Sequence, residues 1–184
     1  QGAPIPEALD ADEMQNIKQN FVNAAKRAVR LGFSAIELHG AHGYLIHEFI
    51  SPISNQREDE FGGSLDNRLK FPLEIFDEVR KVVPSDIALG LRLTGTDWRD
   101  DGLSVEDAKN VAKSFEAHGA DYLCISSGGI TTGLKIPVGP NYQVHLAKGI
   151  KDVVSIPVRA VGLITTAEQA NDIILNGEAD MVAL

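Results

Sequence analysis

The sequence predicts an α/β fold in which parallel strands alternate with helices. Amphipathic segments that begin with helix-capping residues alternate along the chain with short apolar runs, and five of these runs are typical of strands. The intervals between them are typical of βα units, which place successive strands in parallel. Parallel strands are covered on both faces, so the alternation leaves two architectures, a doubly wound sheet or a (β/α)8 barrel. No glycine-rich dinucleotide fingerprint follows any predicted strand.

The barrel interpretation has a consequence for the extent of the chain. A complete TIM barrel has eight strands and usually about 250 residues, whereas this chain has 184 residues and five predicted strands. We therefore expect a partial barrel with five parallel strands and their helices, a single domain over residues 1–184 that forms the C-terminal part of a barrel. The first three βα units would be missing. Gln1 is not an initiator residue, as expected if the chain starts at a cut end.

Capping residues and apolar spacing set the element boundaries. Helices are predicted at 10–31, 66–83, 104–119, about 142–152 and 165–177, and strands at 33–39, 87–93, 121–126, 156–161 and 179–184. Asp10 with Glu13, and Ser104 with Asp107, have the spacing of capping boxes. Pro72 lies inside the second helical segment, so we expect it near the first turn or at a bend.

Composition narrows the classes of function. Seventeen basic against 26 acidic residues give a net charge of −9, so we expect no nucleic-acid partner and no anionic membrane surface. No apolar run is long enough to span a bilayer, and the first residues lack the basic and apolar regions of a signal peptide. The single cysteine, Cys124, cannot form an internal disulfide, so a cytoplasmic location is expected.

Polar residues gather at the predicted carboxyl ends of the strands, where βα folds place their chemistry. In "ELHGAHGYL" (37–45), Glu37 and His39 share one face of the strand end, and His42 and Tyr44 follow it. Arg92 lies within an apolar strand, where a guanidinium is costly unless an anion meets it.

Two further strand ends are rich in small residues. "SSGG" begins at Ser126, and "VGLITT" contains Gly162. Gly162 leaves backbone N–H groups open just before a capped helix, as in the usual phosphate site of a β/α barrel. Plain turns and a helix cap are the commoner meaning of such runs.

Other interpretations of these residues stay open at this level. His39 and His42 lack the spacing and the glutamate of a zinc protease helix, and no cysteine pair joins them, so no metal site is expected. They could be structural histidines. Arg92 could pair with Glu37 on the neighbouring strand instead of binding an anionic ligand. Four other residues are expected to have structural roles: Cys124 in the core, His118 at a helix C-terminus, and both His47 and Trp98 in packing or on a rim.

Together the strand-end residues suit a flat, phosphate-bearing cofactor. Two neutral imidazoles offer one N–H donor each, and converging donors stabilise a carbonyl oxygen that becomes an enolate. Tyr44 supplies a transferable proton on the same side. Such residues favour hydride addition to an activated C=C bond, with the hydride supplied by the cofactor.

The segment "HGAHGYLIHEFISPISNQREDEFGGSLDNR" (39–68) strongly resembles the Old Yellow Enzyme family of FMN-dependent ene-reductases, and within it the bacterial branch with a His/His pair. The motifs "GLRLTG", "ISSGG", "AVGLI" and "ADMVAL" follow in the family's order. The resemblance implies a (β/α)8 barrel of which this chain holds strands four to eight. It also implies FMN as the cofactor, NADPH or NADH as the reductant and an enone-type small molecule as the substrate.

The resemblance assigns roles by position. His39 and His42 correspond to the pair that binds the substrate carbonyl oxygen or a phenolic ligand, and Tyr44 to the proton donor. Arg92 corresponds to an arginine near flavin N1 and O2, and Ser126 to a flavin- or phosphate-contacting position. The same cofactor-contacting role falls to Gly162. Within the 39–68 segment, the charged residues Arg57, Asp59 and Arg68 are expected to order the loop and to take no part in the chemistry.

Several parts of the family pattern fall outside this chain. Strands one to three supply the other face of the flavin, and a Gly-Arg pair is expected after Leu184 to grip the FMN phosphate. Two alternatives follow: a flavin dienoyl-CoA reductase or amine dehydrogenase on the same barrel, or a non-catalytic half-barrel. Five parallel strands without closure leave two bare edges, so we expect a homo-oligomer.

Overall fold

The computed structural model describes residues 7–184 and contains a five-stranded parallel sheet with the strand order β1-β2-β3-β4-β5. The strands are β1 (Ala35–Gly40), β2 (Ala88–Thr94), β3 (Tyr122–Ser126), β4 (Val158–Ala160) and β5 (Met181–Val182). All five lie within the predicted strand segments or extend one residue beyond them. Sequential strands are direct neighbours, which is the order that successive βα units produce when they wind in one direction around a barrel.

The helices follow the predicted alternation. They are α1 (Ala11–Arg30), α2 (Leu45–Ile50), α3 (Leu65–Arg80), α4 (Val105–Ala117), α5 (Val144–Lys151) and α6 (Ala167–Leu175). The capping boxes expected at Asp10 and Ser104 are both formed. The short helix α2 was not predicted. Pro72 is the eighth residue of α3 (Leu65–Arg80), so it does not lie near the first turn, and the alternative of a bend at Pro72 stays a prediction.

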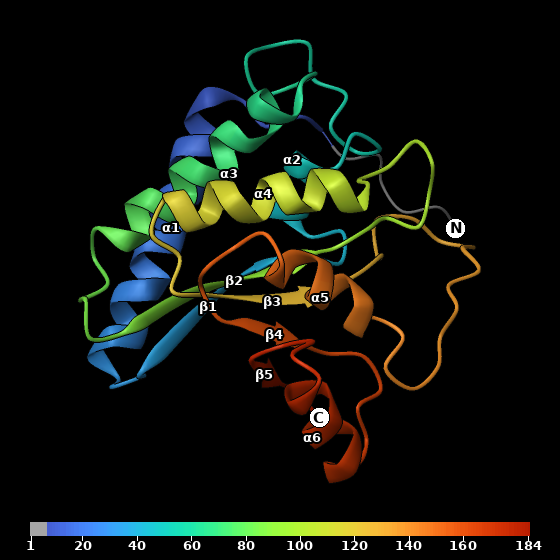
Figure 1. Cartoon of the computed structure of the whole chain (residues 1–184). Coiled ribbons are helices and arrows are strands. Elements are labelled where there is room, and N and C mark those ends of the chain that lie inside the picture. The colour runs from blue at the N-terminus through green and yellow to red at the C-terminus, as the bar shows by residue number, and fades with distance from the viewer. Residues whose placement is uncertain (1–6) are drawn as a thin grey trace.

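Figure 1 shows α1, α3 and α4 together on one side of the sheet, whereas α6 lies against the last strand, β5. The strand residues that face these three helices are apolar and in register, as Leu38, Leu91, Leu123 and Val158 occupy paired positions on successive strands. They belong to a single core cluster with Phe76 and Phe115 from the helices. A doubly wound sheet would have helices on both faces, so this arrangement favours the barrel interpretation.

The opposite face of the sheet is polar. The next register level consists of His39, Arg92, Cys124 and Arg159 on four successive strands. An ion pair joins Arg159 of β4 to Glu37 of β1, although two strands lie between them. Side chains can bridge that gap only if the sheet curls toward this face, which is the curvature of a barrel wall.

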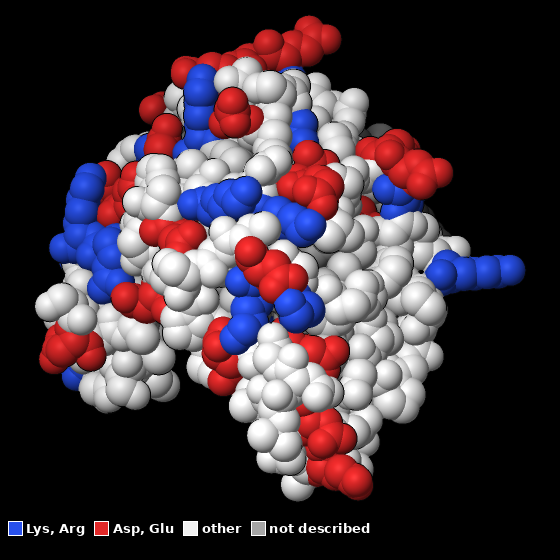
Figure 2. Space-filling view, viewed as in Figure 1, with Lys and Arg blue, Asp and Glu red and all other residues white. Residues whose placement is uncertain are grey.

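Charges are mixed over the surface that Figure 2 displays, where acidic and basic side chains alternate. No helix of the described residues combines the length and the apolar character that crossing a bilayer requires.

Candidate active site

A cavity of about 500 Å³ opens at the carboxyl ends of the strands. Its wall includes His42 and all three residues predicted to bind the cofactor, namely Arg92, Ser126 and Gly162. These four residues come from segments that lie far apart in the sequence. The fold therefore brings the predicted cofactor-binding residues together, and it places one of the predicted catalytic histidines beside them.

The turn after β1 presents the three predicted catalytic side chains together. The ring centroid of His39 lies 5.2 Å from that of His42 and 5.1 Å from that of Tyr44. His42 has a φ of 61°, which is uncommon outside glycine, and Gly43 follows with a φ of 74°. This tight turn reverses the chain so that Tyr44, the N-cap of α2, comes back beside His39. Tyr44 is 63% exposed.

A backbone contact holds this turn against the loop after β3. Gly129 has a φ of 92°, and a Cβ added to it would lie only 2.5 Å from the Cα of His42. Gly43 meets the same glycine from the other side. Any larger side chain at position 129 would displace the turn, so this arrangement of the site requires glycine at position 129.

The environment keeps both histidines neutral. Burial, reinforced by the charge of Arg92, lowers the pKa of His42 to about 4. The same two causes lower the pKa of His39. Each neutral ring has one N–H donor and one acceptor nitrogen. The Nε2 of His42 lies 2.6 Å from the Oγ of Ser126, and among the described residues no partner contacts its Nδ1.

Arg92 has unused hydrogen-bonding capacity. Its Nε is buried and has no hydrogen-bond partner among the described residues. The alternative that Arg92 pairs with Glu37 is wrong, because Glu37 forms its ion pair with Arg159. Arg159 also stacks over the ring of Tyr122 at 5.3 Å. An unpaired guanidinium N–H at a cavity wall is costly unless an acceptor meets it, so Arg92 fits an anionic or carbonyl-bearing ligand.

The Gly162 region closes the other side of the cavity. Gly162 has a φ of 119°, and a Cβ there would lie 2.9 Å from the Nε2 of Gln143. Gln143 in turn accepts hydrogen bonds from Ser127 at 2.6 Å and from Ser126 at 3.3 Å. The cavity, the unpaired Arg92 and this glycine together fit a flat cofactor with negative charge, such as FMN.

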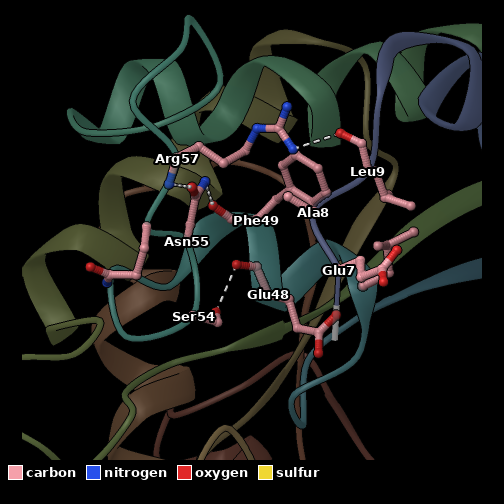
Figure 3. A pocket seen from close by; sticks show the side chains of 10 residues that line it. Glu7, Ala8, Leu9, Glu48, Phe49, Ser54, Asn55 and Arg57 are labelled. Carbon is pink, nitrogen blue, oxygen red and sulfur yellow. Dashed lines mark hydrogen bonds between the residues drawn. The ribbon is translucent and has the colours of Figure 1, made fainter. Parts of the chain in front are cut away.

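The segment after α2 is ordered by its charged residues, as predicted. Arg57 binds the carboxylate of Asp59 and donates to the backbone oxygen of Leu9 at 2.9 Å. Arg68 donates to the backbone oxygen of Ile50 at 2.7 Å. Figure 3 shows Arg57 reaching Leu9 at the wall of a second cavity, of about 430 Å³. None of the six predicted site residues lines that cavity.

Three residues next to the site were not predicted to contribute to it: Gln143, Asp97 and His47. Gln143 lies in a segment without a strand-end motif, so no local pattern marks it. Asp97 lies two residues after the quoted motif "GLRLTG", but an aspartate in a loop is common enough that its position alone does not mark it. His47 does lie within the quoted 39–68 motif, and its position three residues after Tyr44 was the available signal. Cys124 is buried, as expected, and it lines the cavity on the polar face of the sheet. His118 is the C-cap of α4, as expected for a residue at a helix C-terminus.

The fold and the site define a class: part of a β/α barrel that gathers polar side chains around a cavity at the carboxyl ends of its strands. The chain belongs to the NADH:flavin oxidoreductase / NADH oxidase family, whose model matches residues 1–184. This match confirms the predicted family, of the Old Yellow Enzyme type, and the predicted FMN cofactor.

Several curated relatives are similar over nearly the whole chain. An NADPH dehydrogenase of Geobacillus sp. (strain WCH70) is 45% identical over 179 residues, which are 97% of this chain and 52% of that protein. An NADH:flavin oxidoreductase of Gibberella zeae is 41% identical over an alignment of 188 positions that covers 95% of this chain and 46% of that protein. The chain thus spans about half the length of the curated relatives it matches.

Solved structures share the fold. Morphinone reductase superposes with a TM-score of 0.79 at 27% identity, over 100% of this chain and 48% of that one. A 2-naphthoyl-CoA reductase complex superposes with a TM-score of 0.89 at 29% identity, over 96% of this chain and 27% of that one. Histamine dehydrogenase from Rhizobium sp. 4-9 has a TM-score of 0.82 at 31% identity, over 96% of this chain and 26% of that one.

Proposed function

We propose that this chain provides the substrate-polarising part of an FMN-dependent NAD(P)H oxidoreductase that reduces the C=C bond of α,β-unsaturated carbonyl compounds. The observation that supports it most is the grouping of His39, His42 and Tyr44 beside a cavity that contains the unpaired Arg92. The names of the NADPH dehydrogenase relatives support a nicotinamide reductant.

Arg92, Ser126 and Gly162 would hold FMN, with Arg92 donating to the polar edge of the ring system. Bound FMN supplies the hydride that its nicotinamide reductant has delivered to it. The arginine also places positive charge near that edge, which favours the reduced, more anionic form of a flavin.

His39 and His42 would bind the carbonyl oxygen of the substrate. The single hydroxyl proton of Ser126 can go to the Nε2 of His42 at 2.6 Å or to the Oε1 of Gln143 at 3.3 Å, but not to both. In the His42 tautomer with its proton on Nδ1, the hydroxyl proton goes to Nε2, the shorter contact, and the Nδ1–H is then the donor to the substrate. Negative charge grows on the carbonyl oxygen as hydride adds to the β-carbon, so both donors act most strongly in the transition state. Tyr44 would then give its hydroxyl proton to the α-carbon.

The test is made on the native-length gene product purified with FMN. NADPH should bleach the flavin colour anaerobically, and cyclohexenone should restore it. A protein that binds FMN but is not re-oxidised by cyclohexenone would contradict the proposed substrate class. The 184-residue chain alone is the matched comparison: colourless protein of doubled mass would support the half-barrel alternative for this segment.

Two other substrate classes, a CoA thioester and an amine, are supported by the names of solved relatives. A panel of an enone, a dienoyl-CoA and histamine, each mixed with the protein under the same conditions, separates the three. We expect re-oxidation of the reduced flavin by the enone and no reduction of the oxidised flavin by histamine, because the paired neutral histidines offer donors suited to a carbonyl oxygen.

A further inference from the structure

A fully buried histidine–aspartate pair lies directly beneath the turn that bears His42 and Tyr44. His47 of α2 and Asp97, which follows β2, are both 0% exposed. The Nε2 of His47 lies 2.9 Å from the Oδ1 of Asp97. The other oxygen of Asp97 accepts hydrogen bonds from the hydroxyl of Ser51 at 2.6 Å and from the backbone N–H of Leu103 at 2.7 Å.

These bonds fix the protonation of both partners. Burial by itself would raise the pKa of Asp97, but the hydrogen bonds from His47, Ser51 and Leu103 outweigh it and lower that pKa. Asp97 is therefore a carboxylate that accepts hydrogen bonds only. The facing Nε2 of His47 must then carry a proton and donate to it.

The second ring nitrogen of His47 acts on the turn itself. Its Nδ1 accepts the backbone N–H of Gly43 at 2.9 Å. A backbone N–H can only donate, so Nδ1 has no proton and the tautomer is set from both sides. The neighbouring N–H of His42 donates to the Oγ1 of Thr94 at 3.4 Å. The backbone N–H groups of His42 and Gly43 thus both donate to side chains below the turn.

We propose that His47, oriented by Asp97, is a positioning residue that sets the placement of His42 and Tyr44. This inference rests on the proposed function. Gly43 lies between these two residues, and His42 adopts a left-handed φ of 61°, which a non-glycine residue keeps only if its surroundings enforce it. The Nδ1 bond to Gly43 is the buried contact best placed to enforce it, since it holds the turn at its centre.

His47 could instead serve only the stability of the core. Two substitutions of His47 distinguish that structural role from the proposed positioning role. The amide oxygen of asparagine can take the place of Nδ1, so His47→Asn keeps an acceptor for Gly43 but cannot reach Asp97. The amide of glutamine can take the place of Nε2, so His47→Gln keeps a donor for Asp97 but leaves Gly43 without its acceptor. If His47 only stabilises the core, ligand binding should follow overall stability in both variants.

The experiment measures two properties of the FMN-loaded native-length protein. The first is the affinity for para-chlorophenol, followed by its charge-transfer absorbance with the flavin. The second is the midpoint of thermal unfolding. We expect His47→Gln to weaken phenol binding about tenfold or more, as expected for a small displacement of aligned donors, and His47→Asn to weaken it less. The unfolding midpoint should be lower for His47→Asn than for His47→Gln, because His47→Asn leaves the buried Asp97 without one of its hydrogen-bond donors.

Phenol affinity that follows the unfolding midpoint across both variants would overturn the proposal. His118→Gln is the matched control, since His118 forms a comparable pair with Asp77, at 2.8 Å, on the exposed surface. It should change neither measurement.

A readout independent of flavin separates this inference from the proposed function. Imidazole 15N shifts of His47 should report a protonated Nε2 and an unprotonated Nδ1, and the amide of Gly43 should exchange slowly with solvent. The reverse tautomer would overturn the positioning role whatever the reaction is. Conversely, a wild-type protein with the expected tautomer that neither binds the phenol nor reduces an enone contradicts only the proposed function.

Discussion

The Nε2 of His42 lies 2.6 Å from the Oγ of Ser126, although the two residues are 84 positions apart in the sequence. This hydrogen bond joins the loop after β1 to the end of β3. A predicted substrate-binding residue therefore contacts a residue predicted to bind the cofactor. The two halves of the site share one hydrogen-bond network, which continues from Ser126 to Gln143.

The double substitution His39→Ala with His42→Ala should abolish the charge-transfer absorbance that a phenol induces in the flavin. Both rings are neutral donors at the same place, so either alone can retain part of the binding. Absorbance titration with para-chlorophenol measures the effect. FMN content should stay the same, because neither ring is expected to hold the cofactor. Retained colour in the double variant would rule out the oxyanion-binding role.

Tyr44→Phe should slow re-oxidation by an enone by roughly a hundredfold or more, the usual contribution of a positioned proton donor. Flavin reduction by NADPH should keep its rate, since no proton from Tyr44 is needed in that step. Rapid-mixing absorbance of the flavin separates the two half-reactions. Equal slowing of both would indicate instead that Tyr44 shapes the cavity by packing on His39.

Acid should destabilise the protein through His42. The folded pKa is about 4 and the ordinary value is 6.5, so between these pH values the unfolded chain binds more protons than the folded protein. Stability therefore falls as the pH drops through this window. Replacing His42 with glutamine removes this titration, so the unfolding midpoint of the variant should depend less on pH there. The pH dependence of thermal unfolding for the two proteins measures it, and parallel curves would contradict the depressed pKa.

The fold was predictable because its signals are local. Capping boxes at Asp10 and Ser104, and apolar runs at βα spacing, placed nearly every element. The helix α2 escaped because six residues are too few to display a helical period. His39 and Tyr44 could be paired from sequence because they flank one turn.

Long-range partners were not predictable in the same way. Whether Glu37 binds Arg92 or Arg159 depends on how strongly the sheet curls, and no short segment encodes that curvature. The pairing of His47 with Asp97 spans 50 positions and likewise requires the folded barrel wall. Local patterns therefore identified the residues of the site, and the tertiary structure determined which of them are free to bind a ligand.

Gly129→Ala should damage both stability and ligand binding, whereas Gly133→Ala should affect stability alone. Both glycines have a positive φ, 92° and 78°, so each substitution introduces backbone strain of about 1 kcal/mol. Only at Gly129 would the new methyl group meet backbone, 2.5 Å from the Cα of His42, and nothing lies within 4 Å at Gly133. The clash must push the His42 turn away from Ser126. Thermal unfolding and phenol titration of both variants test this, and equal phenol affinity in the two would show that the turn tolerates the displacement.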